Sequence, residues 1–425
     1  MMEKKWDVVI VGGGLAGYVA SNYLSNKNLS ILILEKGNKV GGRARTDKMN
    51  KDYFNLGPHA IYKKGKTSEV LEELGIELNG GTPKLGGVLT QNKKEYTAPL
   101  NPVGLLSTSL LNWKEKFEWM SILSKLPKVD PQTLATQTFQ QWVEQNVHSP
   151  NVQSLLYVLG RLSTYSHSPE KVSAKVIVTH IKIALGGVLY LHGGWQSVID
   201  QLHNKAVITG VQVKTHTSVK QMKRTEQDCI KITLSNNEEI TSKYVISTIG
   251  PLELTNLLET PESVNPMLSS LTPIKGASLD ISLSRLPQPN KLFALDIHEP
   301  LYYSVHSTAA RLSENGHHSV LHVFKYYHPD DEPIHVNVRN ELEQFLETLQ
   351  PGWKDYVVDS RFLPNLIVNQ RLPLVGHEQH FNRSETNIPG LYLAGDWTSP
   401  DYILSEGAVF SGKQAAEEII QKEES

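Results

Sequence analysis

The chain has 425 residues, a formal net charge of −2 at pH 7 and 39% apolar residues. This length is enough for two or more domains, each with its own core. A charge so close to zero gives no overall field that would attract nucleic acid or an anionic membrane, so we expect no nucleic acid partner. The single cysteine, Cys229, excludes an internal disulfide framework and a cysteine-rich metal site.

The sequence also gives expectations about location and metals. The apolar run at residues 8–11 is too short for the core of a signal peptide, and no later stretch approaches the roughly 20 apolar residues of a spanning helix. We therefore expect a cytoplasmic protein. The histidines show no metal-ligand spacing with carboxylates, so we expect no metal site.

A glycine-rich turn lies near the start of the chain. The run Val8–Val11 predicts a buried parallel strand, and Leu15–Leu24 predicts the helix that follows it. Between them, Gly12, Gly14 and Gly17 fit the pattern GxGxxG. These glycines allow a tight turn, close approach of a pyrophosphate and close packing of helix on strand. The helix would direct its free N–H groups at the phosphate.

The next strand, Ser30–Leu34, ends at an acidic residue, Glu35. Its carboxylate can accept hydrogen bonds from both hydroxyls of a ribose, and it disfavours the 2′-phosphate of NADP. Strand, turn, helix and acid occur together within about 30 residues. The sequence therefore predicts a dinucleotide site rather than a turn without a ligand.

Two further motifs point to the kind of dinucleotide. Directly after Glu35, the stretch "KGNKVGGRART" supplies Gly42 for close backbone approach and Arg43 as a cation for a phosphate or a carbonyl. Far downstream, "PGLYLAGDWTSPDYILSEGAVFSGKQAAEEII" reads as a second strand, turn and helix. The predicted strand is Leu391–Ala394 and the predicted helix is Glu406–Ile420.

Together, GxGxxG, the acid, GGR and the C-terminal LAGD…EGAxxSG resemble the superfamily of FAD-dependent amine oxidases, phytoene desaturases and protoporphyrinogen oxidases. The resemblance implies an α/β fold, in which a Rossmann-type FAD-binding domain is interleaved with a mixed α+β substrate domain. The FAD-binding domain would comprise residues 1–62, 187–252 and 385–425. The substrate domain would comprise residues 63–186 and 253–384.

The resemblance also assigns residues to the cofactor. Without a cysteine near the C-terminal motif, attachment through sulfur is not available, so FAD would be non-covalent. A helix N-terminus beside the flavin would stabilise negative charge on its reduced form. The residues expected to contact FAD are Gly12, Gly14, Leu15, Ala16, Gly17, Glu35, Lys36, Gly42, Arg43, Gly57, Pro58, His59, Val219, Gly395, Asp396, Glu406, Gly407 and Ala408.

The chain departs from the amine oxidase pattern on the substrate side. Many amine oxidases have an aromatic ring two residues before the glutamate of EGA; here that residue is Leu404, with Tyr402 as an alternative if the loop shifts. Aligned on "KGASLDISL", the position of a lysine that assists reaction with oxygen is Asp280, with Lys325 as a distant alternative. We therefore expect a substrate that is lipophilic or weakly charged.

His59 is the remaining candidate for chemistry. It follows Gly57 and Pro58 in "FNLGPHAIY", a segment that passes the flavin ring in the family. Histidine is the side chain whose ordinary pKa lies near neutrality, so His59 could act as an acid or base, or simply serve the structure. The candidates for the catalytic site are thus His59, Asp280, Tyr402 and Leu404.

Three functions remain open on these residues. The first is an FAD-dependent desaturase or dehydrogenase that removes a hydride from a small lipophilic substrate. The second is a flavin-containing amine oxidase with unusual pocket residues. The third is a non-catalytic binding protein on the same fold, like the Rab escort proteins, although those lack the intact phosphate-binding glycines and the AGD motif found here.

Two patterns concern the substrate domain, which we expect to be mostly helical over residues 66–186. Apolar residues recur at helical spacing from Leu106 to Leu123, including Trp113, Phe117 and Met120. They suggest either a helix facing the core, which the flanking acids favour, or one lying at a membrane surface. Alternation over Ala277–Leu283 predicts a half-buried strand. Peripheral membrane contact and oligomeric state stay open.

Overall fold

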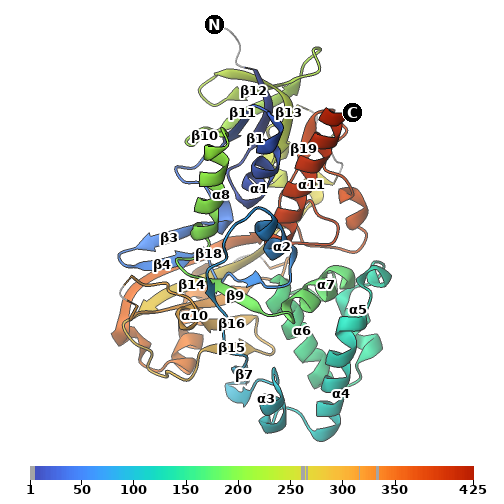
Figure 1. Ribbon diagram of the computed structural model, residues 1–425. Coiled ribbons are helices and arrows are strands. Elements are labelled where there is room, and N and C mark those ends of the chain that lie inside the picture. Colours follow the sequence, from blue (N-terminus) through green and yellow to red (C-terminus); the bar gives the residue numbers. More distant parts are fainter. Residues whose placement is uncertain (1–4, 260–263, 265–266, 315, 332–334) are drawn as a thin grey trace.

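The computed structural model describes residues 5–259, 264, 267–314, 316–331 and 335–425. It contains two seven-stranded sheets, one at the end of the molecule that carries β1 and α11, the other nearer the middle (Figure 1). Helices from residues 102–184 gather beside the second sheet (Figure 1). Among the described residues, no helix is long and apolar enough to cross a membrane.

The first sheet collects strands from three distant parts of the chain. Its order is β10-β2-β1-β13-β12-β11, and β19 pairs with β13. β10, β2, β1, β13 and β19 pair in parallel, while β12 and β11 are antiparallel additions. This parallel core confirms the predicted α/β class. The strands are β1 (Lys5–Val11), β2 (Ile31–Leu34), β10 (Gln212–Lys214), β11 (Val219–Arg224), β12 (Ile230–Leu234), β13 (Glu239–Ser247) and β19 (Leu391–Leu393).

Both faces of this sheet are buried because alternate residues of its strands serve two cores. On one face, Val8 and Ile10 of β1 pack with residues of α1, α8 and α11. On the other, Val9 and Val11 pack in a cluster that includes Trp397. The helices are α1 (Leu15–Leu24), α2 (Lys66–Glu73), α8 (Gln196–Ile208), α9 (Pro251–Thr255) and α11 (Leu404–Glu424).

The second sheet has the order β18-β14-β17-β16-β15-β7-β8. Helix α10 (His335–Leu349) packs on one face, against Leu279 and Ile281 of β14 and their neighbours. The strands are β7 (Val88–Gln91), β8 (Lys94–Thr97), β14 (Ile274–Leu283), β15 (Phe293–Asp296), β16 (Leu301–Val305), β17 (Ser319–Tyr326) and β18 (Val357–Asn369).

The alternation predicted for Ala277–Leu283 is correct, but the expectation that the strand is half-buried is wrong. Its polar residues Ser278, Asp280 and Ser282 are also buried. They lie on the face toward the hairpin of β3 (Thr46–Met49) and β4 (Asp52–Asn55), where Ser282 donates to Asp52 at 2.6 Å. Hydrogen bonds therefore replace water on this face.

The part of the chain expected to be mostly helical also contains strands. Besides β7 and β8, residues 80–81 form β6 (Gly80–Gly81), which pairs with β9 (Val188–Leu191); β5 (Ile61–Tyr62) pairs with β9 as well. Apart from α2 at its start, the helices of this part follow from residue 102 onward. They are α3 (Pro102–Ser107), α4 (Trp113–Lys125), α5 (Phe139–Asn146), α6 (Pro150–Thr164) and α7 (Ala174–Ala184).

The apolar stripe of α4 does not face the core. Trp113 and Phe117 are 65% and 64% exposed, and Met120 is also exposed. The buried face of α4 instead carries Trp119 and Ile122. Leu123, at the end of the stripe, packs partly against the core. The core-facing interpretation is wrong for Trp113, Phe117 and Met120, since helical spacing alone does not say which of two apolar faces is covered.

Candidate functional site

The glycine turn has the geometry of a phosphate cradle. Gly12 has φ +110°, and a Cβ on Gly17 would lie 2.3 Å from the carbonyl oxygen of Gly12, so neither position accepts a side chain. A Cβ on Gly14 would meet nothing within 4 Å. Gly14 is also the N-cap of α1, and no side chain caps that helix. Free N–H groups and open space therefore meet where a pyrophosphate would lie, with Leu15 and Ala16 in the first turn.

Glu35 is held at the end of β2 by two backbone donors. Its Oε2 accepts from Gly13 N at 2.9 Å and its Oε1 from Gly37 N at 2.7 Å. The N–H of Thr217 donates to the carbonyl of Glu35, so the start of β11, with Val219, follows beside it. This arrangement supports the predicted adenosine contacts. Lys36 instead points to the surface and pairs with Glu253.

Arg43 connects the two cofactor motifs. Its Nη1 and Nη2 lie 2.5 and 2.7 Å from the two carboxylate oxygens of Asp396, and Nη1 also donates to the carbonyl of Val368. Asp396 accepts from Gln370 N as well. The GGR loop is itself fixed to the glycine turn, because Gly41 N donates to the carbonyl of Gly13 at 2.7 Å.

The N-terminal end of α11 lies beside this pair. Gly395 N donates to Ser411 Oγ of α11, and no side chain caps the helix. Glu406 is buried and accepts from Thr67 N, and burial raises its pKa above the usual range. Gly407 is packed against the carbonyls of Asp396 and Tyr402, and Ala408 follows it. The two ends of the chain thus meet at one place, as the motifs predicted.

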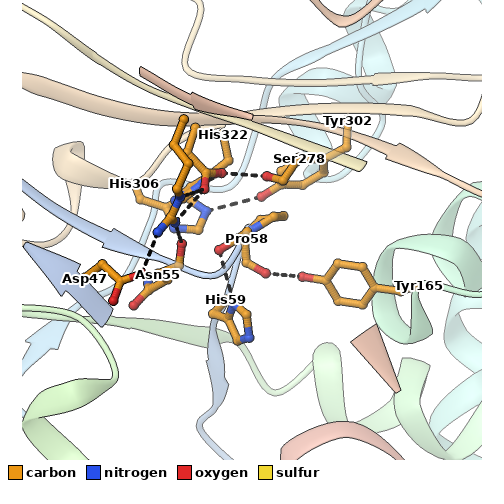
Figure 2. A network of polar contacts seen from close by, with 12 residues as sticks. Asp47, Asn55, Pro58, His59, Tyr165, Ser278, Tyr302, His306 and His322 are labelled. Carbon is orange, nitrogen blue, oxygen red and sulfur yellow. Dashed lines mark hydrogen bonds and ion pairs between the residues drawn. The ribbon is translucent and has the colours of Figure 1, made fainter. Parts of the chain in front are cut away.

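The segment expected to pass the flavin turns sharply at Gly57, which has φ +81°. Pro58 follows, and its carbonyl accepts from the phenol of Tyr165 (Figure 2). His59 Nδ1 lies 3.0 Å from the carbonyl of Gly57. Burial lowers the pKa of His59 to about 4. The side chain is therefore neutral at pH 7, which corrects the expectation of a group that titrates near neutrality.

Ser278 and His322 belong to a polar network close to this turn (Figure 2), and both contact the buried Asp280. One oxygen is 2.7 Å from His322 Nδ1 and accepts from Ser278, and the other is 2.7 Å from Arg361 Nη2. Arg361 also pairs with Asp47. Burial alone would raise the pKa of Asp280, but His322 and Arg361 outweigh it and hold the pKa below its usual value. Its negative charge is thus compensated by a cation.

Tyr402 and Leu404 lie at the start of α11. The ring of Tyr402 packs on Phe410, with centroids 5.4 Å apart, so it faces its own helix. Leu404 has φ +57°, in the left-handed region that leucine rarely adopts, and Asn369 Oδ1 holds its N–H at 2.7 Å. Lys325, the alternative lysine, pairs with Glu341 of α10. It faces the side of the sheet opposite His322.

A small cavity lies between these groups. It is bordered by Arg43 on the cofactor side, by Pro58 and His59, and by the ring of Tyr165. The rest of its lining is apolar: Leu56, Phe324, Leu366, Ile367 and Val368. No carboxylate lines it among the described residues.

Sequence reasoning missed several residues of this region. Arg361 and His322 have no motif, although both belong to strands whose alternation could have placed them on the face of Asp280. His322 Nε2 and His306 Nδ1 are buried without a partner, and the two rings lie 4.5 Å apart (Figure 2). Asn369, which fixes Leu404, gives no sequence signal. Among the described residues, no cluster of side chains could hold a metal ion.

Comparison with known proteins assigns the chain to a family. The family described as flavin containing amine oxidoreductase matches residues 15–420. A probable flavin-containing monoamine oxidase A of Dictyostelium discoideum is 25% identical over 74% of this chain and 70% of its own. A 15-cis-phytoene desaturase from an Oncidium hybrid is 22% identical over 99% of this chain and 78% of its own.

The fold agrees. The crystal structure of a putative protoporphyrinogen oxidase from Exiguobacterium sp. superposes with a TM-score of 0.75 at 18% identity, covering 99% of this chain and all of that one. The chain therefore belongs to the flavin-containing amine oxidoreductase family, and it is an FAD-dependent oxidoreductase that acts on small molecules.

Proposed function

We propose that the protein removes a hydride from an apolar carbon of a lipophilic or weakly charged substrate, as a desaturase or dehydrogenase does. The apolar lining of the cavity beside Pro58 and His59 carries this proposal. The one charged side chain of its lining, Arg43, is paired with Asp396, and no carboxylate of the described residues is present to hold an ammonium group, so an apolar segment binds better there. FAD supplies the acceptor for the hydride when it is bound.

The residues of the cradle fit that cofactor. Open space at Gly14, the uncapped N-terminus of α1 and the fixed carboxylate of Glu35 are suited to a pyrophosphate and a ribose. The uncapped N-terminus of α11 favours negative charge near Glu406 and Gly407. We propose non-covalent binding, with residues 1–62, 187–252 and 385–425 as the FAD-binding domain and residues 63–186 and 253–384 as the substrate domain.

A second candidate, a fast amine oxidase, is less well supported. The aligned position of the lysine that assists reaction with oxygen is occupied by Asp280, and Lys325 faces α10. The charge of Asp280 is balanced by Arg361, so repulsion by this carboxylate is not the reason for slow oxygen chemistry. The reason is the missing cation, which would stabilise developing negative charge.

The test compares electron acceptors. The purified holoprotein is reduced without oxygen and mixed with air-saturated buffer, with and without a soluble quinone, while flavin absorbance is followed. We expect slow return of the oxidised spectrum in air and faster return with quinone. A peroxide assay with mono- and polyamines runs in parallel. Fast oxidation in air together with amine-dependent peroxide would favour the amine oxidase instead.

We further propose that the protein contacts a membrane through α3 and α4. Val103 and Leu106 of α3 are exposed, as are Trp113, Phe117 and Met120 of α4. The helices α3 and α4 lie at the end of the molecule farthest from β1 and the end of α11 (Figure 1). An exposed apolar surface of this kind is typical of peripheral contact with a bilayer, from which a lipophilic substrate would come.

The charges around this surface are those expected for contact with an anionic bilayer. Lys114 and Lys125 of α4 are exposed and have no ion pair among the described residues. The acids of α4 are engaged elsewhere: Glu115 accepts from Asn112 N and Ser149 Oγ, and Glu118 accepts from the N–H of Ser149. The flanking acids that weighed against this interpretation are thus turned toward the start of α6, and the lysines remain available to lipid headgroups.

A further inference from the structure

A second cavity, beside the C-terminal half of α6, contains a buried arginine. Arg161 lies in the last turn of α6 and is 4% exposed. The cavity has a volume of about 190 Å³ and is lined on one side by apolar side chains, including Phe139, Tyr157 and Ile177. Its polar lining is Arg161, Ser154, Ser166, His167 and His298.

The guanidinium of Arg161 is only partly satisfied. Nη2 donates to the main-chain carbonyl of Asp296, and the group lies 5.5 Å from the ring centre of Tyr326. Nε is buried without a hydrogen-bond partner. No carboxylate among the described residues forms an ion pair with it, because the carboxylate of Asp296 accepts instead from Thr90 and from the N–H groups of His298 and Glu299.

A buried guanidinium with too few partners raises the free energy of the folded protein unless a bound group completes its hydrogen bonds. A buried cation loses its hydration, and a carbonyl and an aromatic ring replace only part of it. The polar groups beside Arg161 do not supply the missing charge: burial and the nearby guanidinium lower the pKa of His167 to about 4, so His167 is neutral at pH 7. The cavity thus presents a fixed cation beside hydroxyl and imidazole groups, with no carboxylate of the described residues in its lining.

We propose that Arg161 binds a carboxylate group of the substrate in this cavity. The guanidinium is a planar fork that matches a carboxylate, and the hydroxyls of Ser154 and Ser166 can donate to the same group. The apolar wall receives the adjoining hydrocarbon. If the proposed hydride removal is correct, on which this part rests, the substrate is an amphipathic acid whose apolar segment reaches the cavity beside Pro58.

Tyr165 lines the cavity beside Pro58 and is close in the chain to Arg161, which lines the second cavity. It follows Arg161 by one helical turn, and its N–H donates to the carbonyl of Arg161. Its ring stands 5.8 Å from that of Tyr326, which lies under the guanidinium, and its phenol donates to Pro58 (Figure 2). The end of α6 therefore carries the cation of one cavity and, one turn later, a ring that borders the other.

The test is a binding measurement that needs no turnover. Isothermal titration calorimetry compares 4-phenylbutyrate with 4-phenylbutanol, which differ only in the head group, on the holoprotein. We expect the acid to bind and the alcohol to bind at least about tenfold more weakly, since only the acid satisfies the arginine. Arg161→Met should abolish binding of 4-phenylbutyrate. Arg285→Gln, which changes an exposed arginine on the ring of Tyr356, should leave this binding unchanged.

A second pair of variants keeps Arg161 in place, in case its loss prevents folding. Tyr157→Glu puts a carboxylate one helical turn before Arg161, where it can pair with the guanidinium and compete with the ligand. We expect it to abolish binding of 4-phenylbutyrate, while the neutral Tyr157→Gln retains it. Equal binding of acid and alcohol, no binding of either, or unchanged binding in both Arg161→Met and Tyr157→Glu would overturn the proposal.

The outcomes also separate this site from the proposed reaction. Carboxylate binding that depends on Arg161, in a protein that oxidises amines rapidly in air, would overturn the hydride removal from an apolar carbon and support the subsite. Slow oxidation in air, with no preference for the acid over the alcohol, would support the reaction and overturn the subsite.

Discussion

Arg43 and Asp396 are 353 positions apart in the chain and form a bidentate ion pair, with N–O distances of 2.5 and 2.7 Å. The two members are unequally buried: the side chain of Asp396 is 4% exposed and that of Arg43 is 36% exposed. The pair fastens the GGR loop to the turn that begins α11. It therefore fixes the positions of the two cofactor motifs relative to each other.

This asymmetry predicts which member matters more for stability. Arg43→Met leaves a buried carboxylate without its cation, whereas Asp396→Asn leaves a cation that water can reach. We expect a loss of about 2–4 kcal/mol in the free energy of unfolding for Arg43→Met and about 1–2 kcal/mol for Asp396→Asn. Urea denaturation and a double-mutant cycle measure this. The exposed pair Lys27–Glu424 is the control, with coupling near zero. An equal loss in both variants would contradict the asymmetry.

Glu35→Gln tests the ribose site. Glutamine keeps the shape but removes the charge that strengthens hydrogen bonds from the ribose hydroxyls and from Gly13 and Gly37. We expect FAD affinity to fall by about 1.5–3 kcal/mol with the fold retained. Equilibrium titration of the FAD-free protein measures the dissociation constant, with Glu253→Gln as the surface control. An unchanged constant would place the adenosine elsewhere.

The lowered pKa of His59 predicts that the stability of the protein depends on pH. Its pKa is about 4 in the folded protein, compared with an ordinary value of 6.5. Between these values the unfolded chain binds a proton that the folded protein does not, so stability falls as pH decreases from 6.5 toward 4. We expect His59→Asn to weaken this fall by on the order of 1–2 kcal/mol. Urea denaturation over this pH range tests it. The exposed substitution His317→Asn should leave the slope unchanged; a slope that His59→Asn also leaves unchanged would refute the prediction.

The exposed face of α3 and α4 predicts binding to bilayers. The protein should sediment with vesicles of anionic lipid. The double variant Trp113→Ser, Phe117→Ser should reduce the bound fraction of protein by about tenfold or more, because two interfacial aromatic anchors are lost. Ile208→Ser changes an even more exposed apolar residue, at the end of α8, and is the control. If the double variant binds like the control, the face does not contact lipid.

Much of the cofactor site could be predicted because its elements are continuous in sequence. The turn from β1 to α1 and the turn before α11 each carry their glycines, their acid and their helix within a short stretch, and local sterics dictate that geometry. The pairing of Arg43 with Asp396 was not predicted, although both residues were assigned to the cofactor, since partners on distant segments leave no spacing to recognise.

The substrate side was harder to predict for two physical reasons. Asp280 was placed on its strand, but the charge that compensates it comes from Arg361 on a neighbouring strand, which periodicity cannot match in register. On α4, two apolar faces compete, and the one with Trp119 is buried while the one with Trp113 is not. Which face is covered depends on the tertiary neighbours.

The contact between α1 and α11 has a consequence for biosynthesis. A Cβ on Gly412 of α11 would lie 2.5 Å from the carbonyl oxygen of Ala16 in α1, so the two helices are in direct backbone contact beside the phosphate turn. On the ribosome, α1 emerges long before α11. The face of α1 that packs on α11 therefore stays uncovered during synthesis until α11 has emerged, so the phosphate turn gains its packing partner late and the FAD site is completed only then.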